Sequence, residues 1–281
     1  MNNTCNKRKV SPAAITPMDS AAEFSVLQVK GEEKEFAKMM VAREFPLTII
    51  LNGQELVTLL CTPENLEYLA VGYLFAEGLV ESKAEIKKVL VDEKHGVVRI
   101  DTPQEEGTAH ELLYKRLITS ACGRGAAFYT AADARHPSRV ESIITVSLEE
   151  VLALVKEFDQ RSEMYHMTNG VHSAALCDNK NILVFSNDLG RHNAIDKVFG
   201  ECILKGISTQ DRMVITSGRT PSEMLLKVAK GNIPVLISVS VPTDLGIRLA
   251  NDLGITIIGF VRGDKMNVYT GRQRISGDSV T

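Results

Sequence analysis

The sequence predicts an α/β protein in which a small α+β domain precedes a larger, layered α/β domain. Two patterns support this prediction. Over residues 44–101, two apolar runs precede a helical pattern and two short strands, which is typical of a compact α+β unit. Further along, strand and helix patterns alternate, which favours a sheet covered by helices. We therefore divide the chain into a disordered tail (residues 1–22), an α+β domain (residues 23–115) and an α/β domain (residues 116–281).

The expected tail is rich in Asn, Ser, Thr, Pro and Ala and has no hydrophobic periodicity. The α+β domain then opens with a predicted β-hairpin. Asn52-Gly53 separates the two apolar runs, and this dipeptide readily adopts the positive φ angles of a tight hairpin turn. Thr62 is the expected N-cap of the following helix, and Gly78 follows its expected end.

The α/β domain contains four strand patterns with helical patterns between them. The strands are predicted within residues 181–187, 212–218, 234–241 and 255–261. Two helices are expected to begin with a capping box, in which a hydroxyl side chain and a glutamate three residues later bond the free N–H groups. These pairs are Ser147 with Glu150 and Thr220 with Glu223.

Composition excludes several classes of protein. With 281 residues the chain can bury a sizeable core without disulfide bridges. The net charge of −3 gives no reason to expect a nucleic acid or membrane partner, and no apolar run reaches the roughly 18 residues of a membrane span. The five cysteines form no C-x-x-C pair, so they are expected to be free thiols of a cytoplasmic protein.

Cys122 is the candidate reactive thiol. It lies in the segment TSACGRG, whose small residues leave its sulfur accessible, and Arg124 favours the nucleophilic thiolate. The alternative is a buried cysteine that acts as a small apolar residue, and composition does not separate the two. For Cys61, Cys177 and Cys202 the buried interpretation is preferred, because each adjoins an apolar run.

Two polar loops place glycine and arginine after a strand and before a helix, where α/β proteins bind ligands and helix N-termini attract phosphate. A third polar loop, TNGVHSAAL, contains His172. Each loop alone is compatible with ordinary turn chemistry, but together their charged residues favour an anionic ligand. The candidates are Arg191, His192, Lys197 and Arg219. The basic C-terminal segment, which includes Arg262 and Lys265, is either a phosphate site or a solvated terminus.

No metal site is predicted. The six histidines form no H-E-x-x-H motif and have no C-x-x-C partner, so His172 and His192 are interpreted as hydrogen-bonding residues. No G-x-S-x-G nucleophile elbow is present either.

The ordered motifs TSACG, TNGVHSAAL, NDLGRHNAIDKVFG, SGRTPSEMLLK and GFVRG resemble the formate dehydrogenase accessory sulfurtransferase family (FdhD/NarQ). The resemblance implies a cytidine-deaminase-like three-layer α/β domain and a cytoplasmic homodimer. It also implies a sulfurtransferase that carries sulfur from a cysteine desulfurase to the molybdenum cofactor (Mo-bis-MGD), before this cofactor is inserted into formate dehydrogenase. The family cysteine falls on Cys122. The family's cofactor-binding segment falls on Phe260, Val261, Arg262, Gly263, Asp264 and Lys265.

The sequence departs from the family pattern at four positions. Arg124 replaces the second cysteine of C-G-x-C-G, which places any mechanism with a cysteine pair in doubt. Asn169 stands where a second glycine is usual, Asn187 where a glutamate is usual, and Val241 where an alanine is usual. A single-cysteine persulfide carrier remains compatible with Arg124, whereas the loss of the glutamate weakens any proposal that gives it acid–base work.

The resulting hypothesis is that the Cys122 thiolate accepts a persulfide sulfur and that Arg124 stabilises the anionic sulfur. Arg191, Arg219 and Arg262 are the candidate phosphate or base contacts of the cofactor, beside His192. The alternative is a non-catalytic chaperone that binds the molybdenum cofactor or a guanine nucleotide. A zinc-dependent nucleoside deaminase ranks third, because its H-x-E and P-C-x-x-C motifs do not occur.

Overall fold

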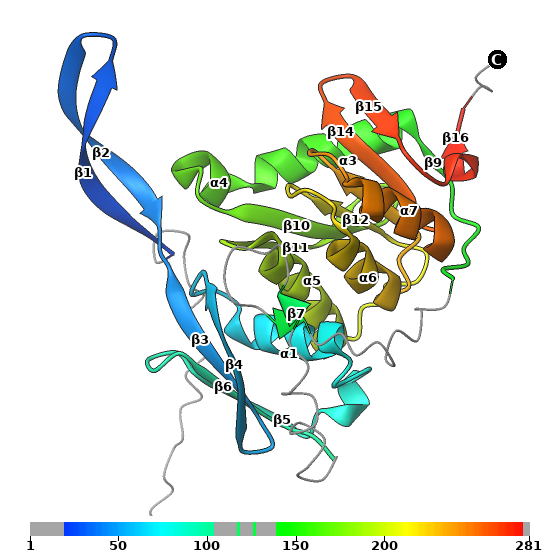
Figure 1. Ribbon diagram of the computed structural model, residues 1–281, viewed down its shortest axis with the longest axis horizontal. Coiled ribbons are helices and arrows are strands. Elements are labelled where there is room, and N and C mark those ends of the chain that lie inside the picture. The colour runs from blue at the N-terminus through cyan, green and yellow to red at the C-terminus, as the bar shows by residue number, and fades with distance from the viewer. Residues whose placement is uncertain (1–19, 104–116, 119–125, 128–138, 278–281) are drawn as a thin grey trace, which may run out of the picture.

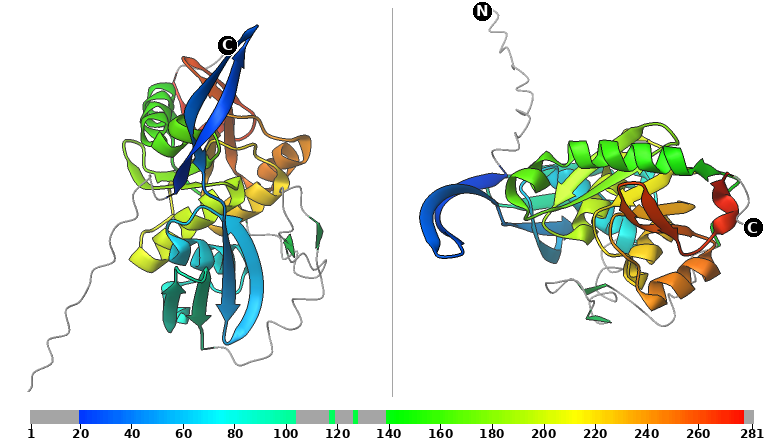
Figure 2. Two further views of the ribbon diagram at one scale, coloured as in Figure 1. Left: turned by 90° about the vertical axis from the view of Figure 1, so that its left-hand side faces the viewer. Right: turned by 90° about the horizontal axis from the view of Figure 1, so that it is seen from above.

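The computed structural model describes residues 20–103, 117–118, 126–127 and 139–277. The two largest sheets in this part of the chain have four strands and six strands (Figure 1). A long two-stranded hairpin extends away from both sheets (Figures 1 and 2). No helix among the described residues is both long and apolar enough to cross a bilayer.

The four-stranded sheet has the order β4-β3-β6-β5. Its strands are β3 (Phe45–Leu51), β4 (Gln54–Cys61), β5 (Lys88–Asp92) and β6 (Val97–Asp101). The predicted β3–β4 hairpin is confirmed, and Asn52 and Gly53 have the φ angles of 48° and 80° that its turn requires. Apolar side chains of this sheet pack on helix α1 (Leu66–Glu77), and a short 3₁₀ turn, η1 (Lys83–Glu85), follows.

The predicted N-cap of α1 is wrong. The helix begins after Asn65 rather than after Thr62, and Gly78 is its C-cap as expected. Thr62 cannot cap this helix because its hydroxyl and N–H are both bonded to Asp188, at 3.3 and 3.1 Å, in the other sheet.

The six-stranded sheet has the order β11-β10-β12-β13-β14-β15. The central strands β12, β13 and β14 are parallel to one another, whereas β10 is antiparallel to both of its neighbours. The six strands are β10 (His172–Cys177), β11 (Ile182–Asp188), β12 (Met213–Thr216), β13 (Val235–Ser238), β14 (Thr256–Arg262) and β15 (Lys265–Val268).

Helices cover both faces of this sheet, so the predicted layered α/β arrangement is confirmed (Figure 1). One face packs on α3 (Leu148–Arg161), which continues into α4 (Glu163–Thr168). The other face packs on α5 (Arg191–Lys205), α6 (Ser222–Lys230) and α7 (Asp244–Leu253). Helix α1 packs against α5, so the two sheets share a helical interface.

One of the two expected capping boxes forms. Ser147 and Glu150 bond reciprocally at the start of α3, as predicted. The prediction for Thr220 and Glu223 is wrong, because Pro221 is the N-cap of α6. The backbone of Thr220 is instead held in an extended bridge by hydrogen bonds with Val241 and Thr243.

The long hairpin consists of β1 (Ala21–Lys30) and β2 (Glu33–Ala42), which pair over ten residues. Its base packs on α4 through a small apolar cluster. These strands were not predicted from the sequence, and β1 includes the last two residues of the expected tail. Short pairs elsewhere join β7 (Leu117–Ile118) to β8 (Ala126–Ala127) and β9 (Val146–Ser147) to β16 (Ile275–Ser276), which follows η2 (Arg272–Arg274).

Candidate functional site

The candidate site lies along one edge of the six-stranded sheet. The parallel strands β12, β13 and β14 all end at this edge, and so does β11. Because β10 runs in the opposite direction, its first residue, His172, lies there as well, directly opposite Asp188. The fold therefore brings together the three polar loops and the C-terminal segment that the sequence singled out.

Arg191 and His192 are the first two residues of α5, after the N-cap Gly190. The side chain of Arg191 packs directly on Gly218, in the loop between β12 and α6. Arg219, the next residue of that loop, is exposed to solvent. These three predicted residues thus lie at the starts of two neighbouring helices.

The predicted cofactor segment consists of the end of β14, the turn at Gly263 and Asp264, and the first residue of β15. Phe260 lies in an irregularity of this pairing and has a φ angle of 57°, which is unusual for a bulky residue. Its N–H donates to the Ser240 carbonyl at 2.6 Å. The Arg262 guanidinium lies over its ring, 4.7 Å from the centroid, so the two exposed side chains form a cation–π pair.

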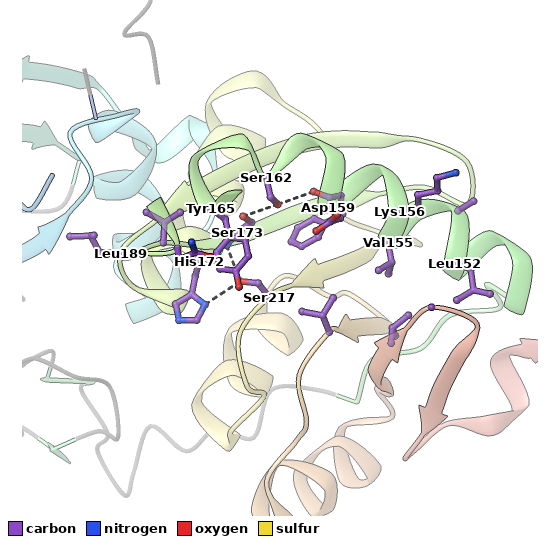
Figure 3. Close-up of a pocket in the computed structure, with 18 residues that line it drawn as sticks. Leu152, Val155, Lys156, Asp159, Ser162, Tyr165, His172, Ser173, Leu189 and Ser217 are labelled. Carbon is purple, nitrogen blue, oxygen red and sulfur yellow. Dashed lines mark hydrogen bonds between the residues drawn. The ribbon is translucent and has the colours of Figure 1, made fainter. Parts of the chain in front are cut away.

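A pocket of about 920 Å³ lies between the α3–α4 layer and this edge of the sheet (Figure 3). Its volume falls within the range of small-molecule sites. Leu152, Val155 and Phe158 give one wall an apolar surface. Of the predicted cofactor residues, only Val261 and Gly263 line this pocket, whereas Arg191, His192 and Arg219 do not.

His172 and Ser217 form the main polar pair of the pocket (Figure 3). The His172 Nδ1 atom lies 3.1 Å from the Ser217 hydroxyl, which accepts the Ser173 N–H at 3.0 Å. When this hydroxyl donates to Nδ1, the neutral ring carries its proton on Nε2. Burial and the nearby charge of Arg191 lower the pKa of His172, although Asp188 opposes this shift. A neutral imidazole is therefore favoured at this position.

Two of the family departures have a structural explanation. Asn169 has a φ angle of 51° at the end of α4, and asparagine tolerates this left-handed conformation better than most residues with a side chain. Asn187 uses its amide oxygen to accept the Ser173 hydroxyl at 2.7 Å, a bond that glutamate could also accept. Both residues are therefore compatible with the local backbone and hydrogen bonds beside the pocket.

His192 lies outside the pocket and is largely buried. Burial, followed by the charges of Lys227 and Arg191, lowers its pKa to about 3. Its Nε2 atom lies 3.4 Å from a Glu223 carboxylate oxygen, but no hydrogen bond to it forms among the described residues. The low pKa indicates a neutral ring, so this is a polar contact rather than an ion pair.

The loop that precedes α5 is anchored by a buried ion pair. The Asp188 carboxylate lies 2.8 Å from the Lys197 ammonium, and both side chains are fully buried. Asp188 also accepts the N–H of Gly190 and the side-chain amide of Asn193. Lys197 donates to the Thr62 hydroxyl at 2.8 Å, so this predicted anion-binding residue has a structural role.

Cys122, the predicted reactive residue, lies outside the described residues, as do Cys5 and Arg124. The strands β7 and β8 pair directly on either side of residues 119–125, which contain Cys122. The three described cysteines, Cys61, Cys177 and Cys202, are buried and unbridged. Burial raises the pKa of each thiol to about 12, which suppresses the reactive thiolate.

The described residues contain no cluster of three or more His, Cys, Asp or Glu side chains that could hold a metal ion.

Several pocket residues were not predicted from the sequence. Lys156, Asp159 and Tyr165 reach this wall from α3 and α4 (Figure 3). Their helical spacing, beside the apolar positions of α3, was the available signal, but it also fits an ordinary solvated helix face.

The chain is similar to proteins of one known family. The model of the FdhD/NarQ family matches residues 42–276. The sulfur carrier protein FdhD of Bacillus subtilis is 46% identical over 246 residues, covering 88% of this chain and 94% of the relative. The protein of the same name from Listeria innocua is 39% identical, covering 92% of this chain and the whole relative.

A solved structure is also similar. It is a crystal structure from Desulfotalea psychrophila, described as that of a formate dehydrogenase accessory protein, with a TM-score of 0.74 and 25% sequence identity. The alignment covers 91% of this chain and 99% of the other. The match of the family model and the identity to curated relatives lead to one conclusion: the chain belongs to the FdhD/NarQ family.

Proposed function

We propose that this protein is a sulfur carrier in the maturation of formate dehydrogenase. In this proposal it takes sulfur from the persulfide of a cysteine desulfurase and transfers it to Mo-bis-MGD, before the cofactor enters formate dehydrogenase. The names of the curated relatives support the sulfur-carrier role, and the description of the solved structure supports the link to formate dehydrogenase.

The assignment of Cys122 depends mainly on the burial and the raised pKa values of the described thiols. Cys61, Cys177 and Cys202 are buried, and their raised pKa values leave almost no thiolate near neutral pH. Cys5 lies outside the region that matches the family, whereas Cys122 lies within it. Cys122 is therefore the residue that we assign to sulfur transfer.

The chemistry is a displacement at sulfur. The Cys122 thiolate attacks the outer sulfur of the donor persulfide, and the donor cysteine leaves as a thiolate. The product is a persulfide on Cys122, so one S–S bond breaks as another forms. In the second step the S–S bond breaks, Cys122 leaves as a thiolate, and the outer sulfur is given up as a neutral atom. The molybdenum substrate would supply the two electrons that make this sulfur a sulfido ligand, so the metal is oxidised as the persulfide is reduced.

We assign part of the acceptor site to the pocket between α3 and the sheet edge. Its volume of about 920 Å³ suits one nucleotide arm of a large cofactor, and Val261 and Gly263 connect it to the predicted cofactor segment. A neutral His172 offers a hydrogen-bond donor to this pocket. Arg191, Arg219 and Arg262 then supply positive charge along the same edge for the pyrophosphate groups.

The cytidine-deaminase-like fold and the domain boundary at residue 115 also belong to this proposal. A mixed sheet between two helical layers supports the former, and separate apolar cores on the two sheets support the latter. A metal-dependent deaminase activity is not proposed, because the sequence lacks the zinc-binding motifs of deaminases.

The decisive experiment is mass spectrometry of the full chain after treatment with a cysteine desulfurase and cysteine. We expect the added mass of one sulfur atom on the peptide that contains Cys122. This addition is lost in Cys122→Ala and retained in the matched control Cys5→Ala. Retention of the label in Cys122→Ala would exclude this assignment.

A non-catalytic chaperone is the second candidate, because the described pocket needs no cysteine to bind a ligand. Cys122→Ser separates the two functions. A chaperone retains both its affinity for the cofactor and its support of formate dehydrogenase activity in this variant. A sulfur carrier retains only the affinity.

A further inference from the structure

Ser217 directly follows β12, and its hydroxyl lies between two groups of β10. The hydroxyl oxygen accepts the Ser173 N–H at 3.0 Å and lies 3.1 Å from Nδ1 of His172 (Figure 3). The backbone holds Ser217 in place, because its own N–H donates to the Ser173 carbonyl at 3.0 Å. His172 and Ser217 are 45 positions apart in the chain, so the pairing of β10 with β12 creates this contact.

The Ser217 hydroxyl has a single hydrogen, and His172 Nδ1 is the acceptor that the structure offers it. When the O–H donates to Nδ1, the oxygen remains free to accept the Ser173 N–H, and all three groups are paired. In the opposite arrangement Nδ1–H would donate to the oxygen. The Ser217 O–H would then lack an acceptor, since it makes no other hydrogen bond among the described residues. An unpaired donor in a part-buried place costs free energy, so the first arrangement is favoured.

The hydroxyl therefore determines which ring nitrogen of His172 carries the proton. With Nδ1 as an acceptor, the neutral ring has its hydrogen on Nε2. Burial and the charge of Arg191 lower the pKa of His172, which keeps the ring neutral. His172 lines the pocket, and Nε2 forms no hydrogen bond within the part of the chain that the structure describes. The Nε2–H group is thus left to donate to a ligand.

We propose that Ser217 is a positioning residue, which makes the His172 end of the pocket select an oxygen acceptor on the ligand. This inference rests on the proposed function, because it concerns the pocket that we assign to one nucleotide arm of the cofactor. An Nε2–H group donates to a carbonyl or phosphate oxygen, but it repels an amino group, which also presents hydrogens. The nearby charge of Arg191 adds to this preference, because it attracts an oxygen with partial or full negative charge.

Two parts of a nucleotide arm offer such an oxygen. One is the base, since guanine carries a carbonyl oxygen where adenine carries an amino group. The other is the phosphate group. A site that donates to a carbonyl rejects the analogue with an amino group strongly, because two donors then face each other without an acceptor. The two sources therefore predict different nucleotide preferences.

The first test is nitrogen NMR of the full chain with ¹⁵N-labelled histidine. The His172 resonances are identified by their loss in His172→Ala. We expect a protonated Nε2 and an unprotonated Nδ1 at neutral pH, both in the natural protein and in Ser217→Thr, which retains the hydroxyl. Ser217→Ala should give a mixture of the two tautomers. The matched control is Ser240→Ala, which removes a hydroxyl in the loop after β13 that does not line the pocket and should leave the His172 resonances unchanged.

The second test is calorimetric titration with GDP, ADP and guanosine. Ser217→Ala should weaken GDP binding about tenfold, which is the usual value of one hydrogen bond, and Ser217→Thr should retain the natural affinity. If the base supplies the oxygen, guanosine loses the same factor as GDP, and ADP binds weakly to all variants. If the phosphate supplies it, ADP loses the same factor as GDP, and guanosine is unaffected. Either pattern supports the proposal and identifies the acceptor.

A double variant tests whether Ser217 acts through His172. His172→Ala should weaken GDP binding at least as much as Ser217→Ala does, and Ser217→Ala/His172→Ala should be no weaker than His172→Ala alone. Circular dichroism melting checks that each variant folds. A protonated Nδ1 in the natural protein, an unchanged GDP affinity in Ser217→Ala, additive losses in the double variant, or no binding of GDP to the natural protein would each overturn the proposal.

Persulfide loading of the natural protein is measured separately, without a nucleotide. A protein that loads sulfur on Cys122 but has its His172 proton on Nδ1 contradicts only the role of Ser217. A protein with the expected tautomer that loads no sulfur on Cys122 contradicts only the sulfur-carrier proposal. The two failures are therefore distinguishable.

Discussion

Gly72 of α1 and Gly200 of α5 face each other at the point where these two helices cross. A Cβ on Gly72 would overlap the Asp196 carbonyl, and a Cβ on Gly200 would overlap the carbonyl of Tyr68. Each glycine therefore permits direct contact between the backbones of the two helices. Because α1 packs on one sheet and α5 on the other, this contact sets the distance between the two sheets.

We expect Gly200→Ala and Gly72→Ala to destabilise the protein by about 3 kcal/mol or more. A backbone atom cannot move aside as a flexible side chain can, so the added methyl group must separate the helices. Urea unfolding followed by circular dichroism measures the effect. Gly190→Ala is the control, because its methyl group would meet only the Asn193 side chain at ordinary contact distance. Equal stability of Gly72→Ala and the natural protein would contradict this account.

Lys197→Met should destabilise the protein by about 3–5 kcal/mol, because it leaves the buried Asp188 carboxylate without its counter-charge. Lys205→Met on the same helix is the matched control. Its partner Glu201 lies at 2.6 Å, but the Lys205 side chain is half-exposed, so we expect a loss of about 1 kcal/mol or less. Adding Asp188→Asn to Lys197→Met should restore part of the lost stability. Denaturant unfolding of all four proteins tests both statements.

Thiol labelling should separate the cysteines into two classes. A protein with both Cys5→Ala and Cys122→Ala should react negligibly with an aromatic disulfide reagent at pH 8 while folded. The remaining thiols are buried, and their pKa values near 12 leave on the order of one thiolate in ten thousand at this pH. Three thiols should react once the protein is unfolded in guanidinium chloride. Rapid reaction of the folded double variant would show that a core cysteine is accessible.

The stability of the protein should decrease as the pH falls below about 6.5, in part because of His192. Its pKa is about 3 in the folded protein, below the ordinary value of 6.5, so only the unfolded chain binds a proton on this residue between these pH values. The contribution of His192 to the free energy of unfolding is therefore fully present above about pH 6.5. Below this pH it decreases by at most about 1.4 kcal/mol per pH unit. Stability curves from pH 8 to pH 4 should be less steep for His192→Gln. A curve that is equally steep for His192→Gln and for the natural protein would contradict this account.

Local rules predicted the parts of the fold whose signals are local. The Asn52-Gly53 turn, the Gly78 cap and the Ser147–Glu150 capping box depend on a few consecutive residues, and all are present. The predicted caps at Thr62 and Thr220 failed because a distant strand or loop binds each of these residues. The β1–β2 hairpin was missed because its apolar residues lie on both faces of the strands. They therefore lack the apolar–polar alternation of a strand that packs on a core with one face.

The candidate site was predictable in its location but not in its composition. Loops after strands pointed to one sheet edge, and the fold places them there. The pocket itself depends on α3 and α4, whose Lys156, Asp159 and Tyr165 carry no motif. Their proximity to His172 arises from the packing of α3 on the sheet, which no spacing along the chain reveals.

The buried contact between Thr62 and Asp188 restricts which segments of two relatives can be combined in one stable chain. Asp188, which ends β11 just before α5, is hydrogen-bonded to Thr62, which directly follows β4. The part of the chain that forms the four-stranded sheet and the part that forms the six-stranded sheet are therefore linked by a buried polar contact. A chimaera that took residues 20–103 from one relative and the remainder from another would have to match a hydroxyl, a carboxylate and an ammonium across the junction. We therefore expect such a chimaera to be less stable than either parent unless all three of these residues are matched.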